Sequence, residues 1–138
     1  MSFCYFKFGS FPNKCLEKFA TYLSPDNTAV LDKNCWDVTA EDLKGKPIDI
    51  FMYDGAHSYE DQKRAITYFA PLLSDTAVIM VDDWLCDWVD VKRGTMDGLS
   101  EAGLTVLYSM EIPFVGCTDF HCGGDTFWNG CGVFVVQK

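Results

Sequence analysis

The strongest hydrophobic pattern in the chain begins at a nearly continuous apolar run, Ile48 to Tyr53, which ends at Asp54. A run of this length and composition predicts a strand that is buried on both faces. A helix is expected next, because Ser58 followed by Asp61 three residues later is typical of a capped helix start. Apolar residues then recur at helical spacing until Pro71, where the predicted helix ends.

A second apolar run, Ala77 to Val81, follows a predicted turn at Asp75 and Thr76. It ends at two consecutive carboxylates, Asp82 and Asp83. Two buried strands joined by a crossover helix form a right-handed unit in which the strands are parallel. The carboxyl ends of these strands should therefore meet at one edge of a sheet.

Four polar side chains are expected at that edge: Asp54, Asp82, Asp83 and, on the loop just after the first of them, His57. Ligands bind at this edge in open α/β sheets. Converging carboxylates repel one another unless a cation or a shared proton neutralises them. Each aspartate taken singly is explained as a helix cap or a solvated residue. Three carboxylates and an imidazole together favour a binding or catalytic site.

The rest of the pattern predicts an α/β domain with helices on both faces of a mainly parallel sheet. Further strands are expected at Phe3 to Phe8, Ala29 to Leu31, Leu104 to Met110 and Gly132 to Val136. Helices are expected after Asn13, briefly after Thr39, and from Val89 to Ala102. The stretch from Trp84 to Trp88 is expected to form a loop over the site, and the long connection from Glu111 to Trp128 to be functional or disordered.

Composition narrows the function classes. The chain has 138 residues, which fits a single domain, residues 1–138, and 49% of them are hydrophobic, as in a globular protein. Its formal net charge of −9 opposes binding to nucleic acid or to anionic membranes. No apolar run is long enough to span a membrane, and the first residues do not resemble a signal peptide. A soluble cytoplasmic protein with a small-molecule substrate is expected.

A second cluster of possible ligands lies near the C-terminus. Cys117, His121, Cys122 and Cys131 offer sulfur and imidazole donors that suit zinc. Their spacing matches none of the paired knuckles that are typical of zinc sites, and the seven cysteines of the chain are scattered like reduced core thiols. Incidental thiols in a loop are the favoured interpretation.

The segment with the strongest pattern also carries a family resemblance. An apolar strand followed by DGAHSYE, a helix ending in PLL and a strand ending in VDDW resembles class I S-adenosylmethionine-dependent methyltransferases. Within that family it is similar to the metal-dependent sugar O-methyltransferases of antibiotic pathways, the macrocin and novobiocin type. This resemblance implies a Rossmann-like sheet in which the last strand pairs antiparallel at the far edge. It also implies a divalent cation, Mg²⁺ above all, on Asp54, Asp82 and Asp83.

The resemblance assigns further roles to single residues. Either Asp54 or His57 would be the catalytic base, although His57 could equally cap the following helix. Trp36 or Asp37 would contact the adenine ring, and Asp54 and Tyr59 are further candidates for binding S-adenosylmethionine. Family members also begin with a strand and a glycine-rich turn, and no such segment precedes Phe3.

Two expectations follow from that missing segment. The first is that S-adenosylmethionine binds weakly or not at all to this chain alone. In agreement with this, the position where the family has an acidic residue that holds the ribose falls near Lys7. A sheet without its first strand leaves backbone groups unpaired, so a homo-oligomer or closure by the Phe3 to Phe8 strand is expected. The two function hypotheses are therefore an O-methyltransferase acting on a small hydroxylated molecule and a non-catalytic, truncated methyltransferase-like binding domain.

Overall fold

The computed structural model describes residues 3–6, 28–31, 33–86, 89–113 and 129–138. The chain divides into two compact units, Met1–Pro47 and Ile48–Lys138. The expectation of a single domain stays a prediction.

The first unit contains a pair of short parallel strands. Strand β1 (Phe3–Phe6) pairs with β2 (Thr28–Leu31), as expected for two strands of a parallel sheet. The helix predicted after Asn13 lies outside the described residues. A short 3-10 helix, η1 (Cys35–Asp37), follows β2.

The helix predicted after Thr39 is instead a series of turns. The backbone N–H of Thr39 donates to Asp42 Oδ2 over 2.8 Å, so the pair interacts in the way a helix cap does. Turn-type bonds follow, such as the one from the Lys44 N–H to the Glu41 carbonyl, and Gly45 ends the segment with a φ of 68°. The segment is too short to continue as a helix before Pro47.

The second unit is built on a four-stranded sheet in the order β3-β4-β6-β5. Its strands are β3 (Ile48–Tyr53), β4 (Leu73–Asp82), β5 (Thr105–Ile112) and β6 (Cys131–Gln137). Strands β3 and β4 are parallel, and β6 is antiparallel to both β4 and β5. The predicted α/β class with an antiparallel last strand is confirmed. The expected place of that strand at the far edge is wrong, because β6 lies between β4 and β5.

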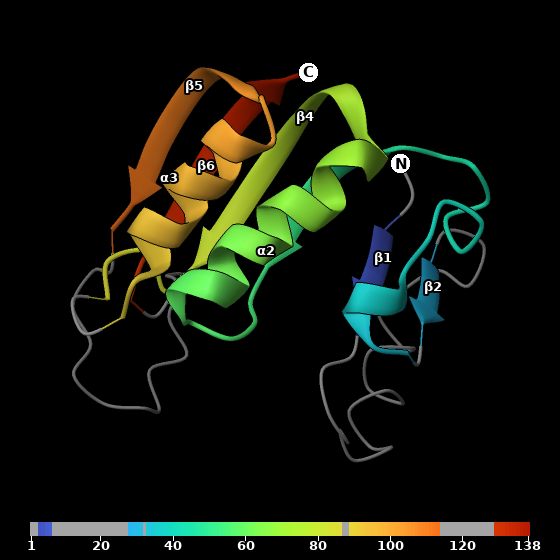
Figure 1. The fold of residues 1–138 in the computed structure, drawn as a ribbon, viewed down its shortest axis with the longest axis horizontal. Coiled ribbons are helices and arrows are strands. Elements are labelled where there is room, and N and C mark those ends of the chain that lie inside the picture. Colours follow the sequence, from blue (N-terminus) through green and yellow to red (C-terminus); the bar gives the residue numbers. More distant parts are fainter. Residues whose placement is uncertain (1–2, 7–27, 32, 87–88, 114–128) are drawn as a thin grey trace. The chain divides into compact units, whose positions relative to one another are not determined.

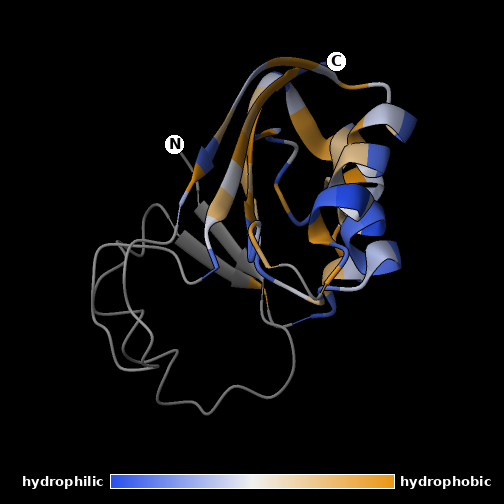
Figure 2. Cartoon of the chain, turned by 90° about the vertical axis from the view of Figure 1, so that its left-hand side faces the viewer, coloured by the Kyte–Doolittle hydropathy of each residue, from blue (hydrophilic) through white to orange (hydrophobic). Residues whose placement is uncertain are grey.

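Two helices cover one face of this sheet (Figure 1). Helix α2 (Tyr59–Phe69) continues into the 3-10 turn η2 (Ala70–Leu72), and α3 (Val91–Glu101) lies beside it. Figure 2 shows hydrophobic residues on the strands and hydrophilic residues on the outer faces of the helices. Among the described residues, no helix has the length and apolar character needed to cross a membrane.

The core of the second unit lies between the helices and the sheet. The ring of Phe51 on β3 stacks on that of Phe69 on α2, with ring centroids 4.7 Å apart. Ile79 of β4 pairs with Phe134 of β6 on the same side of the sheet, and both are buried. This packing joins the predicted crossover helix to the two parallel strands that it connects.

Two local predictions are corrected by this packing. Strand β3 is buried on one face only, because Phe51 and Tyr53 point into the core while Ile50 and Met52 are 40% and 47% exposed. The continuous apolar run predicted burial of both faces of β3. In the described part of this unit, no element covers the second face. Asp75, predicted to lie in a turn, belongs to β4, which begins earlier than its apolar run.

Candidate functional site

A five-residue loop between β3 and α2, Asp54 to Ser58, carries the first two site residues. Strand β3 ends at Tyr53, and α2 is capped by Ser58, whose Oγ accepts a bond from the Asp61 N–H over 3.2 Å. The predicted cap is thus confirmed, and it is Ser58, not His57, that provides it. Asp54 and His57 are held on the short loop between these two fixed points.

The carboxyl end of β4 carries the other two aspartates. Asp82 is the last residue of the strand, and Asp83 follows it with a φ of 54°. This left-handed conformation is uncommon for residues other than glycine, although Asp and Asn adopt it more readily than most. A turn follows directly, in which the Cys86 N–H donates to the Asp83 carbonyl.

Asn129 fixes the carboxylate of Asp83. Its Nδ2 donates to Asp83 Oδ1 over 2.7 Å, and its own φ is 56°. The backbone reinforces this contact, because the Leu85 N–H donates to the Asn129 carbonyl and the Trp84 N–H to the Gly130 carbonyl. Trp84 itself is buried against Phe134. It is therefore part of the core and not of a loop over the site.

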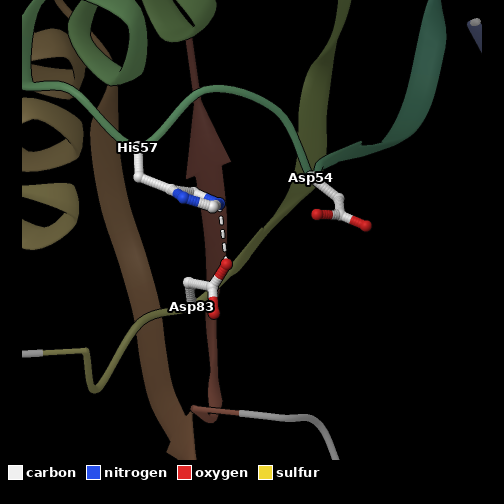
Figure 3. A group of neighbouring side chains, drawn as sticks. All are labelled: Asp54, His57 and Asp83. Carbon is white, nitrogen blue, oxygen red and sulfur yellow. Dashed lines mark ion pairs between the residues drawn. The ribbon is translucent and has the colours of Figure 1, made fainter. Parts of the chain in front are cut away.

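The second oxygen of Asp83 reaches the loop after β3. Asp83 Oδ2 lies 2.7 Å from His57 Nε2 (Figure 3). Asp54, His57 and Asp83 each offer one potential ligand atom, and these atoms lie within 4.8 Å of one another. The imidazole is partly exposed, at 42%, whereas the Asp83 carboxylate is mostly covered. Of the four residues expected at this edge, Asp54, His57 and Asp83 lie together in the fold.

Asp82 is electrostatically coupled to this group, although it does not supply one of the three clustered atoms. Burial, and then the nearby charge of Asp54, raise the pKa of Asp82 from 3.8 to about 6. Its Oδ1 is buried and has no hydrogen-bond partner among the described residues. A buried carboxylate oxygen without a donor is the kind of group that a bound cation or a proton satisfies.

The donor set suits a hard divalent cation. Carboxylate oxygens are the ligands that Mg²⁺ and Ca²⁺ prefer, and the orphaned Asp82 Oδ1 would gain a partner. The same carboxylate oxygens also suit Mn²⁺. The residues present therefore fit a divalent cation at the carboxyl ends of β3 and β4.

The candidates for binding S-adenosylmethionine are divided between the two units. Trp36 and Asp37 lie on η1 in the first unit, where Asn34 Oδ1 accepts from the Trp36 N–H over 3.1 Å. Tyr59 begins α2 in the second unit, and its hydroxyl donates to Asp97 Oδ2 of α3 over 2.8 Å. The phenol is thus engaged by α3, and the cofactor roles of these residues stay predictions.

Sequence reasoning missed Asn129 as a site residue. The hydrophobic pattern places it only on the approach to the last strand, yet it is the hydrogen-bond donor that orients Asp83. The available signal was the Asn129-Gly130 dipeptide, which is typical of a turn with left-handed residues. That signal predicts the turn but does not indicate which distant side chain the amide contacts.

Of the four possible zinc ligands, the structure describes only Cys131. Cys117, His121 and Cys122 lie outside the described residues. Cys131 is fully buried at the start of β6, and burial raises the pKa of its thiol. Its placement agrees with a core thiol, as the sequence suggested.

The carboxyl ends of the parallel strands, where the polar cluster lies, are the edge at which ligands bind in open α/β sheets. The family model for the methyltransferase domain matches residues 12–84, which is more than half of the 138 residues. The chain therefore belongs to the methyltransferase-domain family. No curated protein matches it closely enough to count as a relative.

Solved structures share the fold. A presumed methyltransferase from Thermoplasma acidophilum aligns with a TM-score of 0.56 at 11% identity, over 91% of this chain and 52% of its own. SMU.776, a presumed methyltransferase solved in complex with SAH, aligns with a TM-score of 0.53 at 16% identity, over 90% of this chain and 35% of its own. This chain thus spans about half and about a third of the lengths of these two proteins.

Proposed function

We propose that the protein is an S-adenosylmethionine-dependent O-methyltransferase that acts on a small hydroxylated molecule with the help of a divalent cation, Mg²⁺ first. The observation that carries this proposal is the convergence of Asp54, His57 and Asp83 within 4.8 Å at the carboxyl ends of two parallel strands. Membership of the methyltransferase-domain family supports the choice of reaction. The neighbour solved with SAH supports the choice of methyl donor.

Asp54, Asp82 and Asp83 would hold the cation. When bound, the cation lowers the pKa of an acceptor hydroxyl and orients it, while S-adenosylmethionine supplies an electrophilic methyl group. Asn129 contributes by keeping one oxygen of Asp83 engaged, so that the carboxylate does not rotate freely. The protein's own residues thus preorganise the acceptor site before any substrate arrives.

His57 is the proposed general base. Its Nε2–H donates to Asp83, so the lone pair of the neutral ring resides on Nδ1. Nδ1 can take the proton of an acceptor hydroxyl, and Asp83 stabilises the imidazolium that forms. The partly exposed position of the ring gives a small acceptor access to it.

The cation site is tested by Mn²⁺ binding, measured by electron paramagnetic resonance on the purified chain. Asp82→Asn with Asp83→Asn should abolish binding. The matched control is Asp49→Asn with Asp75→Asn, which makes the same charge change at exposed positions of β3 and β4, away from the carboxyl ends of these strands. Equal loss in both double variants would show a general charge effect and contradict the site.

The reaction is tested by transfer of a labelled methyl group from S-adenosylmethionine to a panel of small sugars and catechols, with and without Mg²⁺. If His57 is the base, His57→Ala should lower kcat by about 10²–10⁴-fold at neutral pH. A variant as active as the wild type would remove His57 from the mechanism. Cation binding without any transfer would favour the alternative, a non-catalytic binding domain.

A further inference from the structure

Two polar side chains are buried in the core among the described residues, Gln62 of α2 and Thr95 of α3. They are 2% and 0% exposed, although the surrounding core is apolar. Burying an amide or a hydroxyl costs free energy unless its hydrogen bonds are made. Their position between two helices and the loop that carries His57 therefore calls for an explanation beyond packing.

Gln62 joins the loop to the helices. Its Nε2 donates to the carbonyl oxygen of Ala56 over 3.1 Å, and its Oε1 accepts from Thr95 Oγ1 over 3.4 Å. Ala56 stands directly before His57 in the loop between β3 and α2. One amide side chain thus links α3, through α2, to the peptide unit that precedes the imidazole.

The close approach of α3 makes this link possible. A Cβ atom at Gly94 would lie 2.5 Å from the Tyr59 carbonyl oxygen and 2.8 Å from Gln62 Cβ. Only a glycine lets α3 lie this near the first turn of α2, where it places Thr95 beside the Gln62 amide. This first turn of α2 directly follows the loop that carries Asp54 and His57.

The loop is then held at two points. Its far end is fixed by the Ser58 cap of α2, and its middle by the bond from Gln62 to the Ala56 carbonyl. Asp54 and His57 lie on either side of that carbonyl. Releasing the carbonyl would leave the loop held at its ends and by the contact of His57 with Asp83, without a fixed point in its backbone. Both side chains would then sample a wider range of positions.

We propose that Gln62 is a positioning residue for the loop that carries Asp54 and His57, with Thr95 orienting its amide. This inference rests on the proposed function for its catalytic meaning, since it concerns how His57 and Asp54 are held for the cation and the acceptor. Gln62 acts through the backbone of Ala56 and contacts none of the three clustered side chains. The value of the buried polar pair lies in orientation, because apolar side chains of similar size would pack as well.

Gln62→Met tests the proposal, because methionine has a similar length and no hydrogen-bonding amide. Two readouts at one fixed pH follow the loop directly: ¹⁵N order parameters of Gly55, Ala56 and His57, and the ¹⁵N signal of His57 Nε2, which reports its bond to Asp83. We expect the order parameters to fall from about 0.85 to below about 0.6 and the Nε2 signal to shift toward that of a free imidazole. The dissociation constant for Mn²⁺ should rise about 3- to 10-fold.

Hydroxyl variants provide the matched controls. Thr95→Val removes the hydroxyl without changing the shape of the side chain and should reproduce the loop changes in part. Thr95→Ser keeps the hydroxyl, so its loop should behave like that of the wild type. Thr67→Val removes a hydroxyl from the same helix α2 that bonds only to backbone carbonyls of Lys63 and Arg64, and it should leave the loop unchanged. If Gln62→Met does not fold, the comparison of Thr95→Val with Thr95→Ser decides.

Unchanged order parameters and an unchanged Nε2 signal in Gln62→Met would overturn the proposal. So would equal effects of Thr95→Val and Thr95→Ser. A wild-type chain that binds no Mn²⁺ would instead refute the cation in the proposed function. The loop readouts do not depend on the metal, so they decide the role of Gln62 in either case.

Discussion

Asp82 is the site residue whose pKa the fold raises. Burial of its carboxyl group is the main reason for the pKa of about 6, and the charge of Asp54 adds to it. A hydrogen bond from the Asp83 backbone and the imidazole of His57 act in the opposite direction. The carboxylate is therefore costly to ionise in the folded protein without a cation beside it.

The pH dependence of stability follows from this raised pKa. Below about pH 3 Asp82 is protonated in both the folded and the unfolded state, so it contributes no penalty. As the pH rises from about 4 to about 6, the unfolded chain loses the proton first, and the free energy of unfolding falls. Above pH 6 the penalty is constant.

Asp82→Asn should therefore stabilise the protein near neutral pH in the presence of EDTA. We expect a gain of about 1 kcal/mol, less than the whole shift would give, because the carboxyl group is partly exposed. Urea unfolding at about pH 3 and at pH 7.5 measures the effect, which should be near zero at the lower pH because Asp82 is then protonated in both states. An equal gain at both pH values would show that Asp82 acts through packing and not through its charge.

At the scale of elements, the contact between α2 and α3 decides how the site is supported. Gly94 and Gly98 lie one turn apart on α3, and a Cβ atom at Gly98 would come within 2.9 Å of both Ile66 Cβ and the Lys63 carbonyl. The sequence pattern of α3 predicts an ordinary amphipathic helix, since Val91 and Leu99 face the core. The small residues add a close backbone approach that the hydrophobic pattern does not indicate.

Gly94→Ala should destabilise the protein although alanine is the better helix former. The gain in helix propensity is about 1 kcal/mol, whereas the overlap with the Tyr59 carbonyl forces a shift of α3 that costs about 1–3 kcal/mol or more. We expect a net loss of about 1–2 kcal/mol in the free energy of unfolding. Chemical denaturation measures it, with Ser100→Ala on the exposed side of α3 as the control. A Gly94→Ala protein more stable than the wild type would contradict the close approach of the two helices.

At the scale of the whole molecule, the second face of the sheet in the Ile48–Lys138 unit is apolar. Its large exposed residues include Ile50 and Met52 on β3 and Tyr108 and Met110 on β5. No helix of the described residues in this unit packs over them, because α2 and α3 both lie on the opposite face (Figures 1 and 2). Exposed apolar surface of this kind is where association takes place.

The expected homo-oligomer stays a prediction, and this face provides its test. If association uses it, the wild type should sediment above 15.6 kDa at micromolar concentration, and Met52→Lys should shift it to the monomer. Met96→Lys is a matched control, because Met96 lies on α3 and is equally exposed, at 47%. A single species at the monomer mass for the wild type would refute self-association. Dissociation by both variants would place the interface elsewhere.

The sequence by itself determined the local elements and the edge at which the site forms. Contacts between residues a few positions apart determine the Ser58 cap, the crossover helix and the apolar runs that end at Asp54 and Asp82. The sequence therefore predicts them directly. Parallel pairing then follows from the length of the connection. The meeting of Asp54, His57 and Asp83 was predictable for this reason.

Only the tertiary structure decided which distant groups hold that site in place. Asn129 reaches Asp83 across 46 positions, and Thr95 reaches Gln62 across 33. These contacts depend on β6 lying between β4 and β5 and on α3 closing onto α2, which arise from the packing of the whole unit. Hydrophobic periodicity describes which face of an element is buried, but it carries no information about which polar partner that face will meet.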